Sequence, residues 1–200
     1  IHMKSVPSLV KVTLFWISLF FLFSCSKSKN ELKFIVDGEK VNNSSSFYNH
    51  VVSLNNSGAK KPFCSGVVID EYYILTATHC LNFNSVEDIV IGFWSKENNS
   101  VSMFRKVEKF HYYNESIKSS EFPNFDVAII ELKKAVPDGI KAVELGSEAY
   151  PSQQLDILGF GKTATICESC SGQLRKANVN IDKIISGPRY NGLFRIKGLN

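Results

Sequence analysis

The stretch Phe63–Cys80, FCSGVVIDEYYILTATHC, decides the fold of this chain more than any other part of its 200 residues. Two short runs rich in β-branched and aromatic residues, 63–69 and 72–77, are separated by the polar pair Asp70-Glu71. Runs of this length and composition, bounded by turn residues, are typical of β-strands. The second run leads directly into Thr-Ala-Thr-His79-Cys80, so we expect His79 to lie at the end of a strand.

Further runs of the same kind continue along the chain. They are rich in Val, Ile, Phe and Tyr, and turn residues such as 55–58, 96–100 and 137–139 separate them. Short strands at a spacing of roughly 8–15 residues, without a long 3.6-residue period, predict an all-β barrel or sandwich. These runs are 51–54, 89–93, 103–110, 127–132, 155–159 and 174–181.

Composition and charge exclude several classes of protein. The chain is 44% hydrophobic and 21% charged, as in ordinary soluble domains, which excludes a disordered chain, a collagen-like fibre and a multi-span membrane protein. The net charge of +4 arises within residues 1–30, which hold four lysines and no acidic residue, so residues 31–200 are neutral overall. Because a nucleic-acid binder needs a basic excess on its folded part, we expect no nucleic-acid partner.

Residues 1–25 have the pattern of a signal peptide. Lys4 and Lys11 precede the apolar run VTLFWISLFFLF at 12–23, and a charged start followed by 7–15 apolar residues is typical of secretory signals. The run is shorter than the roughly 20 residues that span a bilayer. Its end, Leu22-Phe23-Ser24-Cys25, resembles the lipobox of bacterial lipoproteins. That resemblance implies lipidation of Cys25, a membrane attachment by the lipid anchor only, and a location in the bacterial cell envelope or outside the cell.

The remaining residues divide into a short tether and one domain. Residues 26–34 begin with Ser-Lys-Ser-Lys-Asn, a polar run that we expect to be a tether or propeptide. Residues 35–200 are enough for a single domain. Export permits disulfides, and lipidation of Cys25 would leave four of the five cysteines able to pair.

Two motifs resemble hallmarks of the trypsin/chymotrypsin family of serine proteases. Thr-Ala-Thr-His79-Cys80 resembles the family's TAAHC segment, and Asp126-Val-Ala-Ile, 47 positions after His79, resembles its DIAL segment. The family separates this His and Asp by about 45 positions. Weaker likenesses follow the family's order: 35–38 with its IVGG start, 63–66 with its CGG strand, 111–114 with the stretch before the Asp, 159–161 with its GWG strand, and 174–177 with the next strand.

The resemblance implies a fold of two six-stranded antiparallel β-barrels, the second incomplete in these residues, and a serine endopeptidase that acts on proteins or peptides. It implies no cofactor and no metal, and it leaves the oligomeric state open. His79 would take a proton from a serine hydroxyl and return it to the leaving amine, while Asp126 would orient the imidazole and stabilise the imidazolium. Ile35 would be the N-terminus freed on activation. His50 and His111 lack a motif context, and we expect them to be structural.

The family resemblance explains one pair of cysteines and leaves the other pair unexplained. The resemblance implies a disulfide between Cys64 and Cys80 beside His79, and closing a loop of about 15 residues contributes about 3 kcal/mol in the chain-entropy model. Cys167-Glu-Ser-Cys170 matches no family requirement. It fits a redox pair, half of a zinc site that needs a second ligand pair, or, most simply, a small local disulfide in an exported loop.

The family's nucleophile segment, Gly-Asp-Ser-Gly-Gly-Pro, is not found in these 200 residues. The family places that serine about 93 positions after the Asp. Ser186-Gly187-Pro188 lies only 60 positions after Asp126 and follows Ile184-Ile185 instead of Gly-Asp, so we do not expect Ser186 to be the nucleophile.

Two functional classes follow. The first is a trypsin-like endopeptidase that is truncated at its C-terminus here, so that these residues alone are expected to be inactive. The second is a non-catalytic surface lipoprotein, a pseudoprotease that uses the fold for binding. The presence of both His79 and Asp126 favours the first, because a binding module needs neither.

Overall fold

The computed structural model describes residues 38–58, 60, 62–82, 84–113, 126–146, 148–161, 172–185 and 193–198. All of them lie in one compact unit, Lys33–Asn200, whereas the other unit, Ile1–Leu32, lies wholly outside the described residues. Several features predicted from the sequence also lie outside the described residues: the signal peptide with Cys25, the tether 26–34, Ile35, Cys167 with Cys170, and Ser186. Within the described ranges no helix has the length and apolar character needed to cross a membrane.

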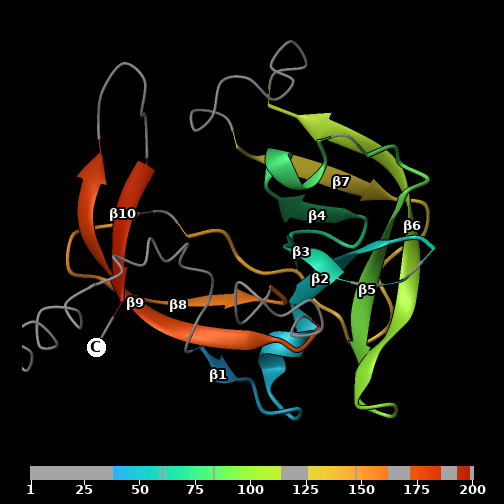
Figure 1. Cartoon of the computed structure of the whole chain (residues 1–200), viewed down its shortest axis with the longest axis horizontal. Coiled ribbons are helices and arrows are strands. Elements are labelled where there is room, and N and C mark those ends of the chain that lie inside the picture. Colours follow the sequence, from blue (N-terminus) through green and yellow to red (C-terminus); the bar gives the residue numbers. More distant parts are fainter. Residues whose placement is uncertain are drawn as a thin grey trace, which may run out of the picture. The chain divides into compact units, whose positions relative to one another are not determined.

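Six antiparallel strands close into a barrel in the order β2-β3-β4-β7-β6-β5 (Figure 1). This architecture confirms the predicted all-β class and the closed six-stranded antiparallel barrel of a trypsin-like fold. The strands are β2 (Val51–Asn56), β3 (Pro62–Val68), β4 (Tyr73–Thr76), β5 (Ile89–Ser95), β6 (Ser100–Tyr112) and β7 (Ala128–Leu132).

A second, four-stranded antiparallel sheet is built around β9 (Arg175–Ile185). One edge of β9 pairs with β8 (Gln154–Gly159). Its other edge pairs with β1 (Glu39–Lys40) at Arg175 and Lys176, and with β10 (Leu193–Gly198) between Val179 and Ile185. Figure 1 shows β8, β9 and β10 in orange to red, after the barrel strands in sequence.

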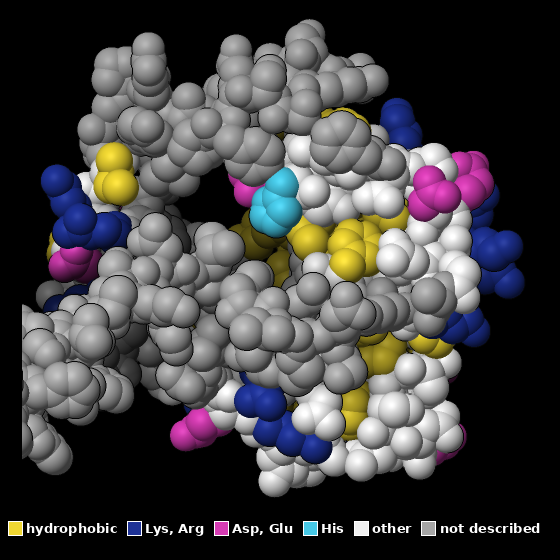
Figure 2. Space-filling view, in the orientation of Figure 1, with side chains coloured by type: hydrophobic (Ala, Val, Ile, Leu, Met, Phe, Trp, Pro, Cys, Tyr) yellow, Lys and Arg dark blue, Asp and Glu magenta, His cyan; other side chains and the backbone are white. Residues whose placement is uncertain are grey.

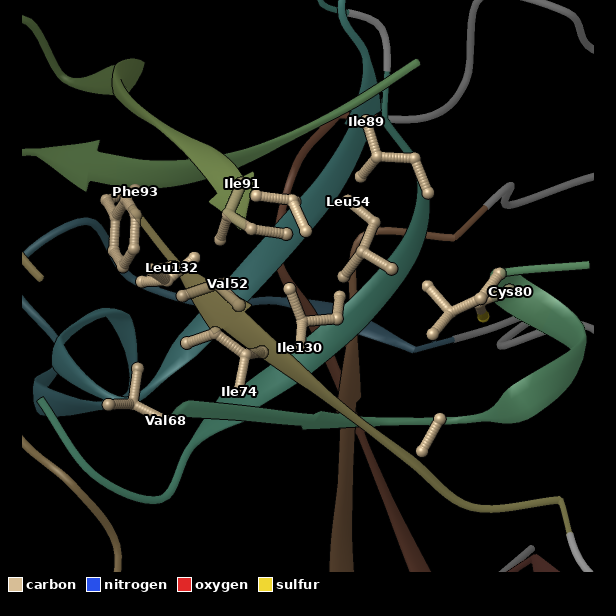
Figure 3. Packing of buried hydrophobic residues seen from close by; sticks show 13 residues of the cluster. Val52, Leu54, Val68, Ile74, Cys80, Ile89, Ile91, Phe93, Ile130 and Leu132 are labelled. Carbon is tan, nitrogen blue, oxygen red and sulfur yellow. The ribbon is translucent and has the colours of Figure 1, made fainter. Parts of the chain in front are cut away.

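Alternating side chains form the core of the barrel (Figure 3). On β7, every second residue from Ala128 to Leu132 is buried, and on β5 the residues Ile89, Ile91 and Phe93 join the same cluster. Successive residues of a strand point to opposite faces, so these positions share the interior. Each large side chain buried in this way contributes about 1.5–3 kcal/mol relative to an exposed one.

Asn55 and Asn56, which the sequence predicted as part of a turn, belong to β2. The Asn55 side chain is fully buried. Its amide donates to the carbonyl and to the hydroxyl of Ser53, both at 2.9 Å, and to the Val90 carbonyl at 3.4 Å. Buried polar groups persist where they are hydrogen-bonded, and these contacts keep a residue typical of turns inside a strand. Ser100, also predicted in a turn, opens β6.

The sequence did not predict β1 or β10. β1 has two residues, too few for a recognisable pattern. β10 reads Leu-Phe-Arg-Ile-Lys-Gly, and the described side chains Arg195, Ile196 and Lys197 are all exposed. A strand whose side chains are exposed lacks the apolar alternation by which strands are recognised in a sequence.

A second apolar cluster joins the barrel to the four-stranded sheet. It contains Tyr48 from η2, a 3-10 turn at Ser46–Asn49, together with Trp94 of β5, Phe160 and Leu174. The rings of Tyr48 and Trp94 stack with their centroids 4.1 Å apart. Burial raises the pKa of the Tyr48 phenol above its ordinary value. The barrel and the sheet therefore share a packed core.

Candidate active site

Two neighbouring strands of the barrel bring His79 and Asp126 together. β4 ends at Thr76, and His79 follows in η3 (Thr78–Cys80), a single 3-10 turn. Asp126 lies two positions before the start of β7. β4 and β7 pair antiparallel, with Thr76 opposite Ala128. The end of one strand and the approach to the other are therefore side by side.

The carboxylate of Asp126 holds His79 at two points. Its Oδ2 lies 2.8 Å from Nδ1 of the His79 ring, and its Oδ1 accepts a hydrogen bond of 2.9 Å from the His79 backbone N–H. The His79 side chain is 54% exposed and that of Asp126 is 27% exposed. Hydrogen bonds to a carboxylate are among the stronger kinds in proteins. The pair is thus oriented by the protein and still reachable from the surface.

This geometry fixes the tautomer of His79. An ionised carboxylate only accepts hydrogen bonds, so Nδ1 carries the proton and Nε2 of the neutral ring has the lone pair. A neutral imidazole in this state can remove a proton from a hydroxyl group. The nearby carboxylate would stabilise the imidazolium that results. The arrangement is suited to general-base catalysis by Nε2.

A disulfide joins Cys64 of β3 to Cys80 of η3, as the family resemblance implied. The two sulfurs and a ring nitrogen of His79 all lie within 4.8 Å of one another. The thiolate is the form of cysteine that binds metals, and neither sulfur of a disulfide is a thiolate. This cluster therefore does not offer a zinc ligand set, and the disulfide instead fixes the backbone next to His79.

The other described histidines lie in separate contacts. Nδ1 of His50 is 2.8 Å from the carbonyl oxygen of Lys141. Nε2 of His111 is 2.8 Å from Oε2 of Glu131, and the ring of Tyr73 meets the His111 ring edge-on. Neither contact includes His79 or Asp126, in keeping with the structural role expected for both residues.

Charges of both signs occur on the described surface. In Figure 2, Lys and Arg side chains lie at the margin of the visible face with Asp and Glu side chains among them. Ion pairs such as Lys133 with Glu108 and Lys176 with Asp156 mix the two signs locally. Residues 31–200 have no excess of either sign, in agreement with this distribution.

Thr78 was not predicted from the sequence as a site residue, but the structure places it beside His79 and Asp126. The Thr78 hydroxyl donates a hydrogen bond of 3.0 Å to the carbonyl of Val127, the residue that follows Asp126. The only sequence signal was the Thr in Thr-Ala-Thr-His79-Cys80, where the family hallmark TAAHC has Ala. Its partner could not be identified without the pairing of β4 with β7.

Comparisons with known proteins point to one family. The family model described as Trypsin matches residues 35–191. The chain is 29% identical over 154 residues to Trypsin Blo t 3 of Blomia tropicalis, and the aligned region covers 74% of this chain and 55% of that protein. It is 30% identical over 133 residues to Trypsin delta of Drosophila erecta, with 65% and 51% covered.

Hypodermin-A of Hypoderma lineatum is 27% identical over 133 residues, with 65% of this chain and 50% of that protein covered. The chain thus spans about half the length of the curated relatives it matches. The residues matched by the family model include the whole barrel and the His79–Asp126 pair. The chain belongs to the trypsin family.

Proposed function

We propose that the protein containing these residues is a serine endopeptidase that hydrolyses peptide bonds in protein or peptide substrates. The observation that carries the proposal is the 2.8 Å contact between Nδ1 of His79 and Oδ2 of Asp126. His79 is the general base for a serine hydroxyl and then the general acid for the leaving amine. Asp126 holds the ring in the required tautomer. Membership of the trypsin family supports these roles.

The proposed reaction also needs a serine nucleophile and oxyanion donors. No Gly-Asp-Ser-Gly-Gly segment occurs in the 200 residues. Loss of the nucleophile alone lowers kcat by about 10⁶-fold in such enzymes. A polypeptide limited to these residues is therefore expected to show no measurable peptidase activity.

Peptide hydrolysis by protein produced from the complete gene tests the proposal. Asp126→Asn should lower kcat by about 10⁴-fold, because an amide at this position favours the wrong tautomer. His79→Ala should lower it by about 10⁶-fold. His111→Gln is the matched control, since His111 also pairs with a carboxylate but belongs to no part of the proposed mechanism. Full activity in Asp126→Asn and His79→Ala would refute these roles.

The second candidate is a non-catalytic surface protein that uses the same fold for binding. The two proposals make opposite predictions about the coding DNA. The endopeptidase requires a Gly-Asp-Ser-Gly-Gly segment in one of the frames past codon 200, whereas the binding protein does not. Reading that DNA separates the two candidates before any assay.

We also propose that residues 1–25 direct export and that Cys25 receives a lipid, which would place the protein in a bacterial cell envelope. The lipobox-like Leu22–Cys25 supports this proposal. The disulfide between Cys64 and Cys80 supports an oxidising compartment, where such bonds persist. Incorporation of labelled palmitate should be lost in Cys25→Ala. Incorporation that survives the substitution would place the lipid elsewhere.

A further inference from the structure

We propose that Thr78 is a positioning residue for the His79–Asp126 pair, and that its hydroxyl fixes the backbone from which Asp126 extends. This inference rests on the proposed function. Thr78 is buried, with 6% of its surface exposed. Its Oγ1 donates to the Val127 carbonyl at 3.0 Å. The bond therefore joins the residue before His79 to the residue after Asp126.

The Thr78 hydrogen bond lies just beyond the end of the ladder between β4 and β7. The hydrogen-bonded ladder between β4 and β7 ends at the pair Thr76 and Ala128. Beyond that pair the chain leaves β4 at Ala77 and turns into η3, so the strands no longer pair. The side chain of Thr78 supplies the next connection between the two segments. It extends the attachment of β4 to β7 up to the catalytic residues.

The Thr78 bond differs in kind from the two bonds between His79 and Asp126. Both of those bonds end on the Asp126 carboxylate, which can rotate about its side-chain torsions. The Thr78 bond ends on a backbone carbonyl and so constrains where the Asp126 backbone lies. A threonine side chain has few accessible rotamers, so the donor oxygen is itself well placed.

His79 therefore lies between two anchors. On one side, the Cys80 disulfide ties η3 to β3. On the other side, the Thr78 hydroxyl ties η3 to the Asp126 segment. The hallmark TAAHC has Ala where this chain has Thr78, and an alanine side chain cannot form such a bond. The second anchor is thus a feature of this sequence.

Hydrogen exchange measured by NMR on the ¹⁵N-labelled 200-residue chain tests the inference without requiring catalysis. The two protons to follow are the His79 backbone N–H and the His79 Nδ1–H, both donors to Asp126. Thr78→Val keeps the shape of the side chain and removes the hydroxyl, and Thr78→Ser keeps the hydroxyl. Thr76→Val is the matched control, because Thr76 is also buried and donates to the Ser65 carbonyl at 3.0 Å.

Thr78→Val should speed exchange of both His79 protons about tenfold, the effect of losing one hydrogen bond. Thr78→Ser should stay within about threefold of the wild-type rate, and Thr76→Val should leave both rates unchanged, because its bond does not reach Asp126. Unchanged rates in Thr78→Val, or equal acceleration in Thr76→Val, would overturn the inference.

Two further outcomes are informative. If Thr78→Val does not fold, Thr78→Ala, which introduces the residue of the family hallmark, replaces it in the same comparison with Thr78→Ser. If both His79 protons exchange freely in the wild-type chain, the His79–Asp126 pair is not formed. That result would remove the basis of the proposed function as well. If instead both protons are protected in the wild-type chain and Thr78→Val leaves their exchange rates unchanged, only the positioning role is overturned.

Discussion

The hydroxyl of Ser65 on β3 accepts a hydrogen bond of 2.8 Å from the backbone N–H of Phe160, 95 positions later in the chain. The carbonyl of the same residue accepts from the Thr76 hydroxyl on β4. Ser65 thus connects its strand both to the segment after β8 and to the strand that leads to His79. It directly follows Cys64, whose disulfide partner is Cys80. The contact between barrel and sheet therefore lies beside the candidate active site.

We predict that Ser65→Ala lowers the free energy of unfolding by about 1–3 kcal/mol, because the Phe160 N–H loses its acceptor in a partly buried position. Urea denaturation gives the value. Ser102→Ala is the control, since the Ser102 hydroxyl accepts from Asn98 on the exposed surface and its loss should change stability by less than about 0.5 kcal/mol. Equal effects of the two substitutions would contradict the role of Ser65.

The second prediction concerns the disulfide. Replacing Cys64 and Cys80 together by Ala should lower stability by about 3 kcal/mol, because the unfolded chain gains the freedom of the open loop. Thermal unfolding under non-reducing conditions measures the loss. Mass mapping of unreduced peptides provides the independent check on pairing. A peptide that joins Cys64 to Cys167 or Cys170 would show that this bond is not the one formed.

A third prediction comes from the close packing around Gly92. A Cβ atom at this position would lie 2.6 Å from Asn55 Nδ2, from Ser53 Oγ and from Val101 Cγ1. Ser53 and Asn55 are fully buried and hydrogen-bonded to each other, so they cannot easily move aside. Gly92→Ala should therefore cost about 1–3 kcal/mol.

The control for this prediction is Gly146→Ala, because a Cβ there meets no atom within 4 Å. Equilibrium unfolding of both variants gives the comparison. If Gly92→Ala is as stable as Gly146→Ala, the polar side chains of β2 rearrange more readily than the structure indicates.

The fourth prediction is a dependence of stability on pH. The Ser85 backbone N–H and the Ser85 hydroxyl both donate to Asp88 Oδ2, at 2.9 and 2.7 Å, and they hold the pKa of the Asp88 carboxyl below its ordinary value. Aspartate in an unfolded chain has a pKa of about 3.9. The carboxylate therefore contributes stability above about pH 4, and the contribution is lost as the pH falls through the lower pKa of the folded state.

Urea midpoints measured between about pH 2 and pH 6 test this assignment. The stability of the wild type should fall as the pH is lowered, in part because the Asp88 contribution is lost. Asp88→Asn should remove that part of the dependence of stability on pH. Ser85→Ala should weaken it, since the hydroxyl bond is lost and the backbone bond remains. An identical slope in wild type and Asp88→Asn would contradict the assignment.

The sequence predicted those parts of the fold that are encoded locally. Every predicted strand overlaps a strand of the structure, with ends that differ by one residue in several cases, because burial of alternate side chains, as on β7, leaves a periodic pattern. The prediction missed the end of β2 at Asn55, which a bond network with Ser53 and Val90 keeps in the strand. It also missed β10, whose described side chains are exposed.

In the candidate active site, too, the residues marked by a local motif were predicted and those that depend on distant contacts were not. His79 and Asp126 were predicted because motif and spacing identify them in the sequence. The contribution of Thr78 depends on the pairing of β4 with β7, and that of Ser65 depends on a partner 95 positions away. Contacts between distant segments leave no local pattern, so these roles required the structure.

The proposed function requires that His79 activates a serine nucleophile. Labelling of protein produced from the complete gene with a fluorophosphonate probe tests it most directly, because the probe reacts covalently with an activated serine. One serine should be labelled in the wild-type protein, with no labelling in His79→Ala and none of a polypeptide limited to residues 26–200. Labelling that persists in His79→Ala would show that His79 is not the residue that activates the nucleophile, and labelling of Ser186 in the 26–200 polypeptide would contradict the expected absence of a nucleophile there.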